Sequence, residues 1–217
     1  MVKTYAVIGL GRFGVSLAAR LFQEGQEVLG VDVNEERVED AQSVVTHAVI
    51  ADSTDPEALK SIGIRNFDTV IVAIGNDIQA SILTVLLLKE AGVKKVIAKA
   101  LNKPHGQVLD KVGADWIIFP ERDMGERVAH MLLSPNVLNF IELSKEYSVE
   151  EMKVPESMTS KTLRELDLRA KYNLSVIAIR HAKSINISPS PDETIEAGDV
   201  LVVIGENKDL EKFANLQ

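Results

Sequence analysis

The chain contains no cysteine, which excludes disulfide bonds, thiolate metal sites and cysteine nucleophiles. Positive charge is also scarce, since 24 Lys and Arg face 32 Asp and Glu for a formal net charge of −8. Nucleic-acid binding needs a basic surface, so no nucleic-acid partner is expected. The most apolar helix-like run, 78–88, is far shorter than the roughly 20 residues of a membrane span, and no signal-peptide pattern opens the chain. These absences predict a soluble, cytoplasmic protein.

Strand and helix patterns alternate through residues 3–133. Short apolar runs rich in Val, Ile and Ala are typical of buried parallel strands, and amphipathic segments between them predict helices. The expected strands are 5–8, 27–31, 48–50, 69–74, 95–98 and 116–119, and the main expected helices are 13–24, 34–42, 77–91, 104–112 and 121–133. The pattern predicts an α/β domain over 1–133 with a Rossmann-like, doubly wound parallel sheet.

A different pattern follows the first domain. Ser134-Pro135-Asn136 interrupts the last helix, so 134–144 is interpreted as a crossover or linker. The remaining residues, 145–217, predict a small α+β domain. Its expected strands are 147–154, 175–180, 184–188 and 200–204, and its expected helices are 161–167 and 208–215.

A glycine-rich turn joins the first strand to the first helix. Gly9-Leu10-Gly11-Arg12-Phe13-Gly14 has the spacing G-x-G-x-x-G. In this position Gly9 permits a tight turn, Gly11 lets the backbone approach phosphate, and Gly14 lets the helix pack on the sheet. The helix N-terminus then offers free N–H groups to an anion. This context predicts a nucleotide phosphate site.

Three further positions complete the predicted nucleotide site. Asp32 ends the second strand, 23 residues after Gly9, where a carboxylate accepts from ribose hydroxyls. Asp52-Ser53 follows the third strand, where adenine is expected, and Gly75-Asn76 follows the fourth, at the crevice where open α/β sheets bind ligands. Asp32 would repel the 2′-phosphate of NADP.

Arg12 distinguishes between the remaining nucleotides. Backbone amides and the helix dipole are sufficient for a dinucleotide pyrophosphate, so a guanidinium in the glycine turn favours the terminal phosphate of ADP or ATP. An NAD-dependent oxidoreductase or NAD(H) sensor is the alternative, and it leaves Arg12 unexplained. A third possibility is a purely structural oligomerisation domain with no ligand.

The sequence offers no recognisable catalytic arrangement. Its four histidines show no metal-ligand spacing, and none adjoins a nucleophile motif. We therefore expect a nucleotide sensor rather than an enzyme.

The run 78–88 is apolar nearly all round, whereas a surface helix has one apolar stripe. This predicts a contact with another subunit, and the alternative is full burial of the helix within one chain.

A combination of segments is informative beyond the glycine motif: 9–14, Val31-Asp32, 47–49, 72–76, 78–81, 119–125 and 167–172. Together these segments resemble the Ktr-type regulatory subunits of bacterial potassium uptake, which consist of RCK (regulator of potassium conductance) N- and C-lobes. The resemblance implies a homo-oligomer, typically an octameric ring of dimers, below a membrane-embedded potassium-transporting subunit. ATP and ADP would compete for the cleft and switch the ring.

The resemblance also implies residue roles. Gly9, Gly11 and Gly14, with Arg12 and Phe13 between them, would hold the phosphates, and Arg12 would reach a terminal phosphate in the neighbouring subunit. Lys99 would lie near the phosphates, and Glu121 would help to hold Mg²⁺ or another divalent cation. Cyclic di-AMP would bind the C-lobe in a region that includes Leu168, Arg169, Asn173, Leu174, Ser175 and Pro189.

Overall fold

The computed structural model describes residues 2–134 and 136–215. The chain divides between Asp123 and Met124 into two compact units, each with its own sheet and core. The first unit contains a six-stranded sheet in the order β3-β2-β1-β4-β5-β6, and every neighbouring pair is parallel. Its strands are β1 (Thr4–Ile8), β2 (Glu27–Asp32), β3 (His47–Ile50), β4 (Thr69–Val72), β5 (Val96–Lys99) and β6 (Trp116–Ile118).

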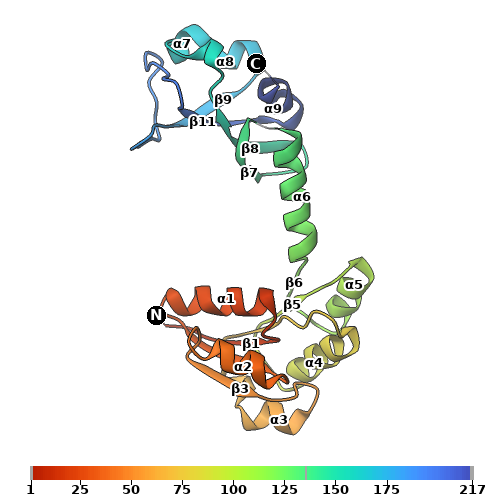
Figure 1. Ribbon diagram of the computed structural model, residues 1–217. Helices are drawn as coiled ribbons and strands as arrows, with labels where there is room; N and C mark the ends of the chain where they lie inside the picture. Colours follow the sequence, from red (N-terminus) through yellow and green to blue (C-terminus); the bar gives the residue numbers. More distant parts are fainter. Residues whose placement is uncertain (1, 135, 216–217) are drawn as a thin grey trace. The chain divides into compact units, whose positions relative to one another are not determined.

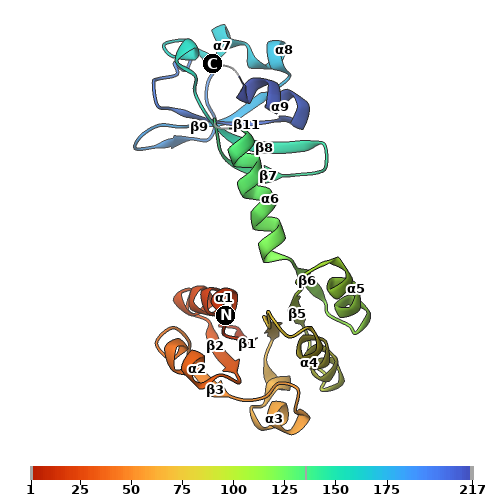
Figure 2. The same ribbon diagram turned by 45° about the vertical axis from the view of Figure 1, so that its right-hand side comes forward.

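Helices cover both faces of this sheet (Figure 1). They are α1 (Arg12–Gln23), α2 (Glu35–Ala41), α3 (Pro56–Ser61), η1 (Ile64–Asn66), α4 (Ile78–Glu90) and α5 (Lys103–Lys111). Residues of α1 and α2 pack with one face of the sheet, whereas α3, α4 and α5 contribute Leu59, Val85, Leu88 and Leu109 to the core on the other (Figure 2). The predicted doubly wound α/β fold is confirmed.

Short polar side chains begin four of these helices. Asn34, Asp55, Asp77 and Asn102 each accept a backbone N–H of the first turn, which satisfies a donor that has no partner within the helix. Helix α1 differs, because its N-cap residue is Gly11 and no side chain caps it. The start of α1 therefore keeps its backbone donors available.

The second unit contains a five-stranded antiparallel sheet in the order β10-β9-β11-β8-β7. Its strands are β7 (Val137–Glu142), β8 (Tyr147–Lys153), β9 (Ser175–Arg180), β10 (Ile185–Asn186) and β11 (Val200–Glu206). Its helices are η2 (Glu156–Met158), α7 (Leu163–Leu166), α8 (Leu168–Tyr172) and α9 (Asn207–Ala214). Helix α6 (Pro120–Leu133) begins in the first unit and continues into the second.

The segment 134–144 is not simply a linker, because it contains β7 and pairs with β8. Pro135, part of the predicted helix break, lies outside the described residues. Helix α8 was also missed, and α6 starts one residue earlier than expected. Among the described residues, no helix is both long enough and apolar enough to cross a membrane.

Candidate nucleotide site

The glycine turn lies between the end of β1 and the start of α1, at the carboxyl edge of the parallel sheet. Gly9 has φ +96°, and a Cβ there would lie 2.9 Å from the backbone of Ala73 and Ile74. A Cβ on Gly14 would lie 1.9 Å from the Gly9 carbonyl oxygen. Both glycines are therefore required by close backbone packing, before any ligand is considered.

Gly11 is under a different constraint. Its backbone is extended, with φ −72° and ψ −177°, and a Cβ built there meets no atom within 4 Å. The first turn of α1 contains no acidic residue, and Arg12 is exposed at its first position. Free N–H groups, the positive end of the helix dipole and open space beside Gly11 together fit a bound phosphate.

Asp32 joins the end of β2 to the glycine turn. Its carboxylate is buried, Oδ2 accepts the Leu10 N–H at 2.7 Å, and Oδ1 accepts the Asn34 N–H at 2.9 Å. Nη1 of Arg37 lies 3.5 Å from Oδ2. A carboxylate has about four acceptor positions, so Asp32 retains capacity for a ribose hydroxyl. Asp32 also fixes the glycine turn through the Leu10 N–H, and the sequence motif alone does not predict this role.

The two residues predicted to lie near adenine face different surroundings. Asp52 is exposed, and hydrogen bonds from the hydroxyl and N–H of Thr54 lower the pKa of its carboxyl. Ser53 is buried, and its hydroxyl lies 2.8 Å from the Thr84 hydroxyl of α4. The Ser53 side chain therefore helps to attach the loop to α4, so any contact with a base would fall to its backbone.

Lys99 and Glu121 form an ion pair at the same edge of the sheet. Nζ of Lys99 lies 2.5 Å from Oε1 of Glu121 and 5.7 Å from the centre of the Phe13 ring. A Cβ on Gly75 would lie 3.9 Å from the same ammonium, whereas neighbouring Asn76 is exposed. The hydrogen bond from Lys99, helped by the charges of Lys99 and Arg12, lowers the pKa of Glu121. The structure thus brings Phe13, Gly75, Lys99 and Glu121 together.

A divalent cation would need donors from outside one chain. Within residues 2–134 and 136–215, no three His, Asp or Glu side chains gather where they could hold a metal ion. Glu121 supplies a single carboxylate, and its side chain is 67% exposed. Mg²⁺ in nucleotide sites commonly takes one or two carboxylates together with phosphate oxygens and waters. The donor set fits a cation shared with a bound nucleotide.

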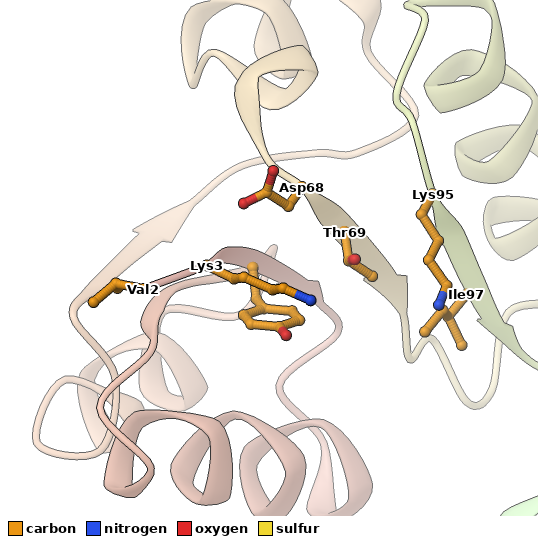
Figure 3. Close-up of a pocket in the computed structure, with 7 residues that line it drawn as sticks. Val2, Lys3, Asp68, Thr69, Lys95 and Ile97 are labelled. Carbon is orange, nitrogen blue, oxygen red and sulfur yellow. The ribbon is translucent and has the colours of Figure 1, made fainter.

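A pocket of about 500 Å³ lies at the opposite, amino edge of the sheet (Figure 3). Its lining comes from the starts of β1, β4 and β5, including Lys3, Tyr5, Thr69 and Lys95. This pocket is separate from the glycine turn and from every predicted nucleotide residue.

The residues predicted for cyclic di-AMP divide into buried and exposed groups. Leu168 and Leu174 are buried in the core of the second unit, so any ligand contact falls to their backbone atoms. Arg169, Asn173 and Ser175 are exposed, and Pro189 is half-buried. Nδ2 of Asn173 donates to Oδ2 of Asp209 at 3.4 Å. Binding of cyclic di-AMP in this region stays a prediction.

Comparison with known proteins accounts for both units. The TrkA-N domain model matches residues 5–120 and the TrkA-C domain model matches residues 149–217. The chain is 49% identical over 213 residues to Ktr system potassium uptake protein C of Bacillus subtilis (strain 168), and 50% identical over 213 residues to protein A of the same system and organism. Each alignment covers 98% of this chain and 96% of its relative. The chain belongs to the Ktr family.

The fold of this Ktr family member is similar to that of a solved channel structure. It matches a structure described as "GsuK channel bound to NAD" with a TM-score of 0.54 and 25% identity. That match covers 97% of the Ktr chain and 38% of the channel chain, so the channel contains much that this chain does not. The structural match and the two domain models confirm the predicted fold and the predicted family resemblance.

Proposed function

We propose that this Ktr family member is a cytoplasmic regulatory subunit that binds ATP or ADP at the carboxyl edge of its parallel sheet and thereby controls a membrane-embedded potassium-transporting subunit. Support for the potassium partner comes from the near full-length similarity to potassium uptake proteins A and C. Support for a regulatory rather than catalytic role comes from the same similarity, because both relatives carry names of potassium uptake proteins.

The observation that carries this proposal is the charged cluster next to the glycine turn. The hydrogen bond from Lys99, together with the positive charges of Lys99 and Arg12, lowers the pKa of Glu121, and all three residues lie by the open start of α1. ATP and ADP differ by one phosphate and its counter-ion, so a site that distinguishes them needs cationic groups at that position. A ligand shifts a two-state equilibrium only through different affinities for the two states. That difference is assigned to Arg12 and Glu121, and Glu121 would help to hold Mg²⁺ or another divalent cation near the terminal phosphate.

Assembly into a ring, typically an octameric ring of dimers, is part of the same proposal. On α4, the apolar side chains of Ile78, Leu83 and Leu86 are 40%, 36% and 38% exposed. Ser81, Thr84, Val85 and Leu88 of the same helix are buried in the first unit. An apolar helix face that one chain leaves uncovered favours burial against another copy. Arg12 is exposed, so it is accessible to a nucleotide bound by such a neighbour.

NAD(H) is a second candidate ligand. Asp32 suits an unphosphorylated ribose, and the channel structure that this chain resembles is described as bound to NAD. An NAD(H) sensor would use the same glycine turn but would gain little from Arg12. A purely structural domain would bind no nucleotide at all.

Thermal melting of the purified protein separates these possibilities. A ligand that binds only the native state at 100 times its Kd stabilises it by about 2.7 kcal/mol. Distinct shifts with ATP plus Mg²⁺ and with ADP, and little shift with NAD⁺ or NADH, would support the proposal. A shift confined to NAD⁺ or NADH would favour the NAD(H) sensor.

Potassium flux into vesicles containing the transporting subunit, with and without this protein, then tests regulation directly.

A further inference from the structure

The ion pair between Lys99 and Glu121 is unequal in its exposure to solvent. The Lys99 side chain is only 8% exposed, whereas the Glu121 side chain is 67% exposed. Among the described residues, Glu121 is the carboxylate that lies within ion-pair distance of the Lys99 ammonium. Burial of an ammonium without an anion is strongly unfavourable, but an exposed carboxylate is solvated by water at little cost. Lys99 therefore requires an anion, and Glu121 does not require Lys99.

The surroundings of Lys99 show where a competing anion would lie. Its ammonium faces the ring of Phe13 in the first turn of α1 and lies close to Gly75, just after β4. These elements border the open start of α1 beside Gly11. A phosphate group there carries more negative charge than a carboxylate and offers more acceptor oxygens, so it is the stronger partner for a buried ammonium.

Glu121 lies on α6, so the pairing of Lys99 with either Glu121 or phosphate affects this helix. Glu121 is the second residue of α6, the helix that leads out of the first unit, whereas Lys99 is the last residue of β5 in the central sheet. The ion pair is thus a side-chain connection between the sheet and the first turn of α6. Loss of the pair removes that connection.

We propose that Lys99 exchanges the Glu121 carboxylate for a phosphate of the bound nucleotide, so that nucleotide binding releases the first turn of α6 from β5. This inference rests on the proposed nucleotide function. In the protein without ligand, Glu121 acts as a stand-in for phosphate. In the protein with nucleotide, Glu121 is free to take a divalent cation or to contact another subunit.

The exchange predicts that removal of the Glu121 charge strengthens nucleotide binding. With EDTA present, Glu121→Gln should lower the Kd for ADP and ATP about three- to tenfold, because the nucleotide no longer competes with an ionised partner for Lys99. Isothermal titration calorimetry measures both constants. The matched control is Glu90→Gln, which removes the same charge at an exposed position at the far end of α4 and should leave both constants unchanged.

A second variant distinguishes exchange from simple charge repulsion. Loss of the Glu121 charge also removes repulsion between carboxylate and phosphate, but that benefit does not depend on Lys99. Under the exchange, Glu121→Gln should give no gain in a Lys99→Met background, where the buried side chain keeps its length and loses its charge. A gain of equal size in both backgrounds, or no gain in either, would overturn the inference.

Hydrogen exchange of residues 120–126 provides a readout that does not depend on affinity. Nucleotide should accelerate exchange of this segment in the native protein, and Glu121→Gln should show the faster rate before any nucleotide is added. Unchanged rates with saturating nucleotide would contradict release of α6. If the native protein binds none of the four nucleotides, the proposed function itself fails, which is distinct from binding without exchange.

Discussion

The Leu10 N–H donates to Oδ2 of Asp32 across 2.7 Å, so the glycine turn is held by the same carboxylate that is predicted to bind ribose. The other oxygen accepts the Asn34 N–H at 2.9 Å, where the chain leaves β2 for α2. A single buried side chain therefore fixes the backbone on both sides of the expected ligand. Stability and binding are coupled at this position.

Replacement of Asp32 by Asn should damage both properties. Asn has one acceptor oxygen, so its amide NH₂ must face either the Leu10 N–H or the Asn34 N–H, and one of these two donors loses its partner. We expect a loss of about 1–3 kcal/mol in the free energy of unfolding, together with weaker nucleotide binding. Urea denaturation and calorimetry measure the two effects. Asp40→Asn, at an exposed position of α2, is the control, and equal stability of the two variants would contradict this role of Asp32.

Gly11 and Gly14 should respond to alanine in opposite ways. A Cβ on Gly14 would lie 1.9 Å from the Gly9 carbonyl oxygen, so Gly14→Ala must displace α1 and should lower stability by about 3 kcal/mol or more. A Cβ on Gly11 meets no protein atom within 4 Å. Gly11→Ala should therefore fold normally and lose nucleotide affinity, because its methyl group occupies the space that phosphate needs. Normal ADP binding by a stable Gly11→Ala protein would argue against a phosphate at this turn.

Arg12 should determine the preference between ATP and ADP. Arg12→Ala is expected to weaken ATP binding about tenfold or more and ADP binding less, since a guanidinium acts most strongly on the terminal phosphate. Arg20→Ala is the matched control, because Arg20 is an exposed residue of the same helix, paired with Glu24. Neither change should lower the melting temperature by more than about 2 °C, given that both side chains are exposed. An unchanged ratio of the two affinities in Arg12→Ala would contradict the assigned role.

The sequence predicted the helices and strands that are determined by residues close together in the chain. Apolar runs and capping residues such as Asp55 and Asp77 locate helices and parallel strands, because neighbours in the chain determine both. Strand β7 was missed because it follows an apparent break and is defined by pairing with β8. Ser53 stays a predicted ligand residue, but the contact of its hydroxyl with Thr84, 31 residues away, has no signal in the local sequence.

The arrangement of the candidate site shows the same limit. The motif predicted Gly9, Gly11 and Gly14, and the structure adds why Gly9 and Gly14 cannot carry a side chain. Lys99 and Glu121 were each expected near phosphate, yet their ion pair spans 22 positions of sequence and has no local signature. Contacts of this kind follow from the order of β5 and β6 in the sheet, which no short pattern encodes.

His181 in the second unit should make stability depend on pH. Its Nδ1 lies 2.9 Å from Oδ1 of Asp199, and its Nε2 lies 3.3 Å from Oε1 of Glu193, so both ring nitrogens face carboxylates. The hydrogen bond with Asp199 is the main cause of a raised His181 pKa, with Glu193 adding to it. The protonated ring is therefore favoured in the folded state. Its contribution is fully present below the unfolded pKa of about 6.5 and is lost as pH rises through the higher folded pKa.

Comparison of the native protein with His181→Gln tests this dependence. Gln can still donate one hydrogen bond but carries no charge, so the difference in melting temperature should be about 2–4 °C at pH 6 and smaller at pH 9. Scanning calorimetry at the two pH values measures it. His47→Gln, at an exposed position that starts β3, is the matched control for the loss of a histidine. A gap between native protein and His181→Gln that widens toward pH 9 would mean that the neutral ring is the stabilising form, because only then would loss of the proton strengthen the contacts with Asp199 and Glu193.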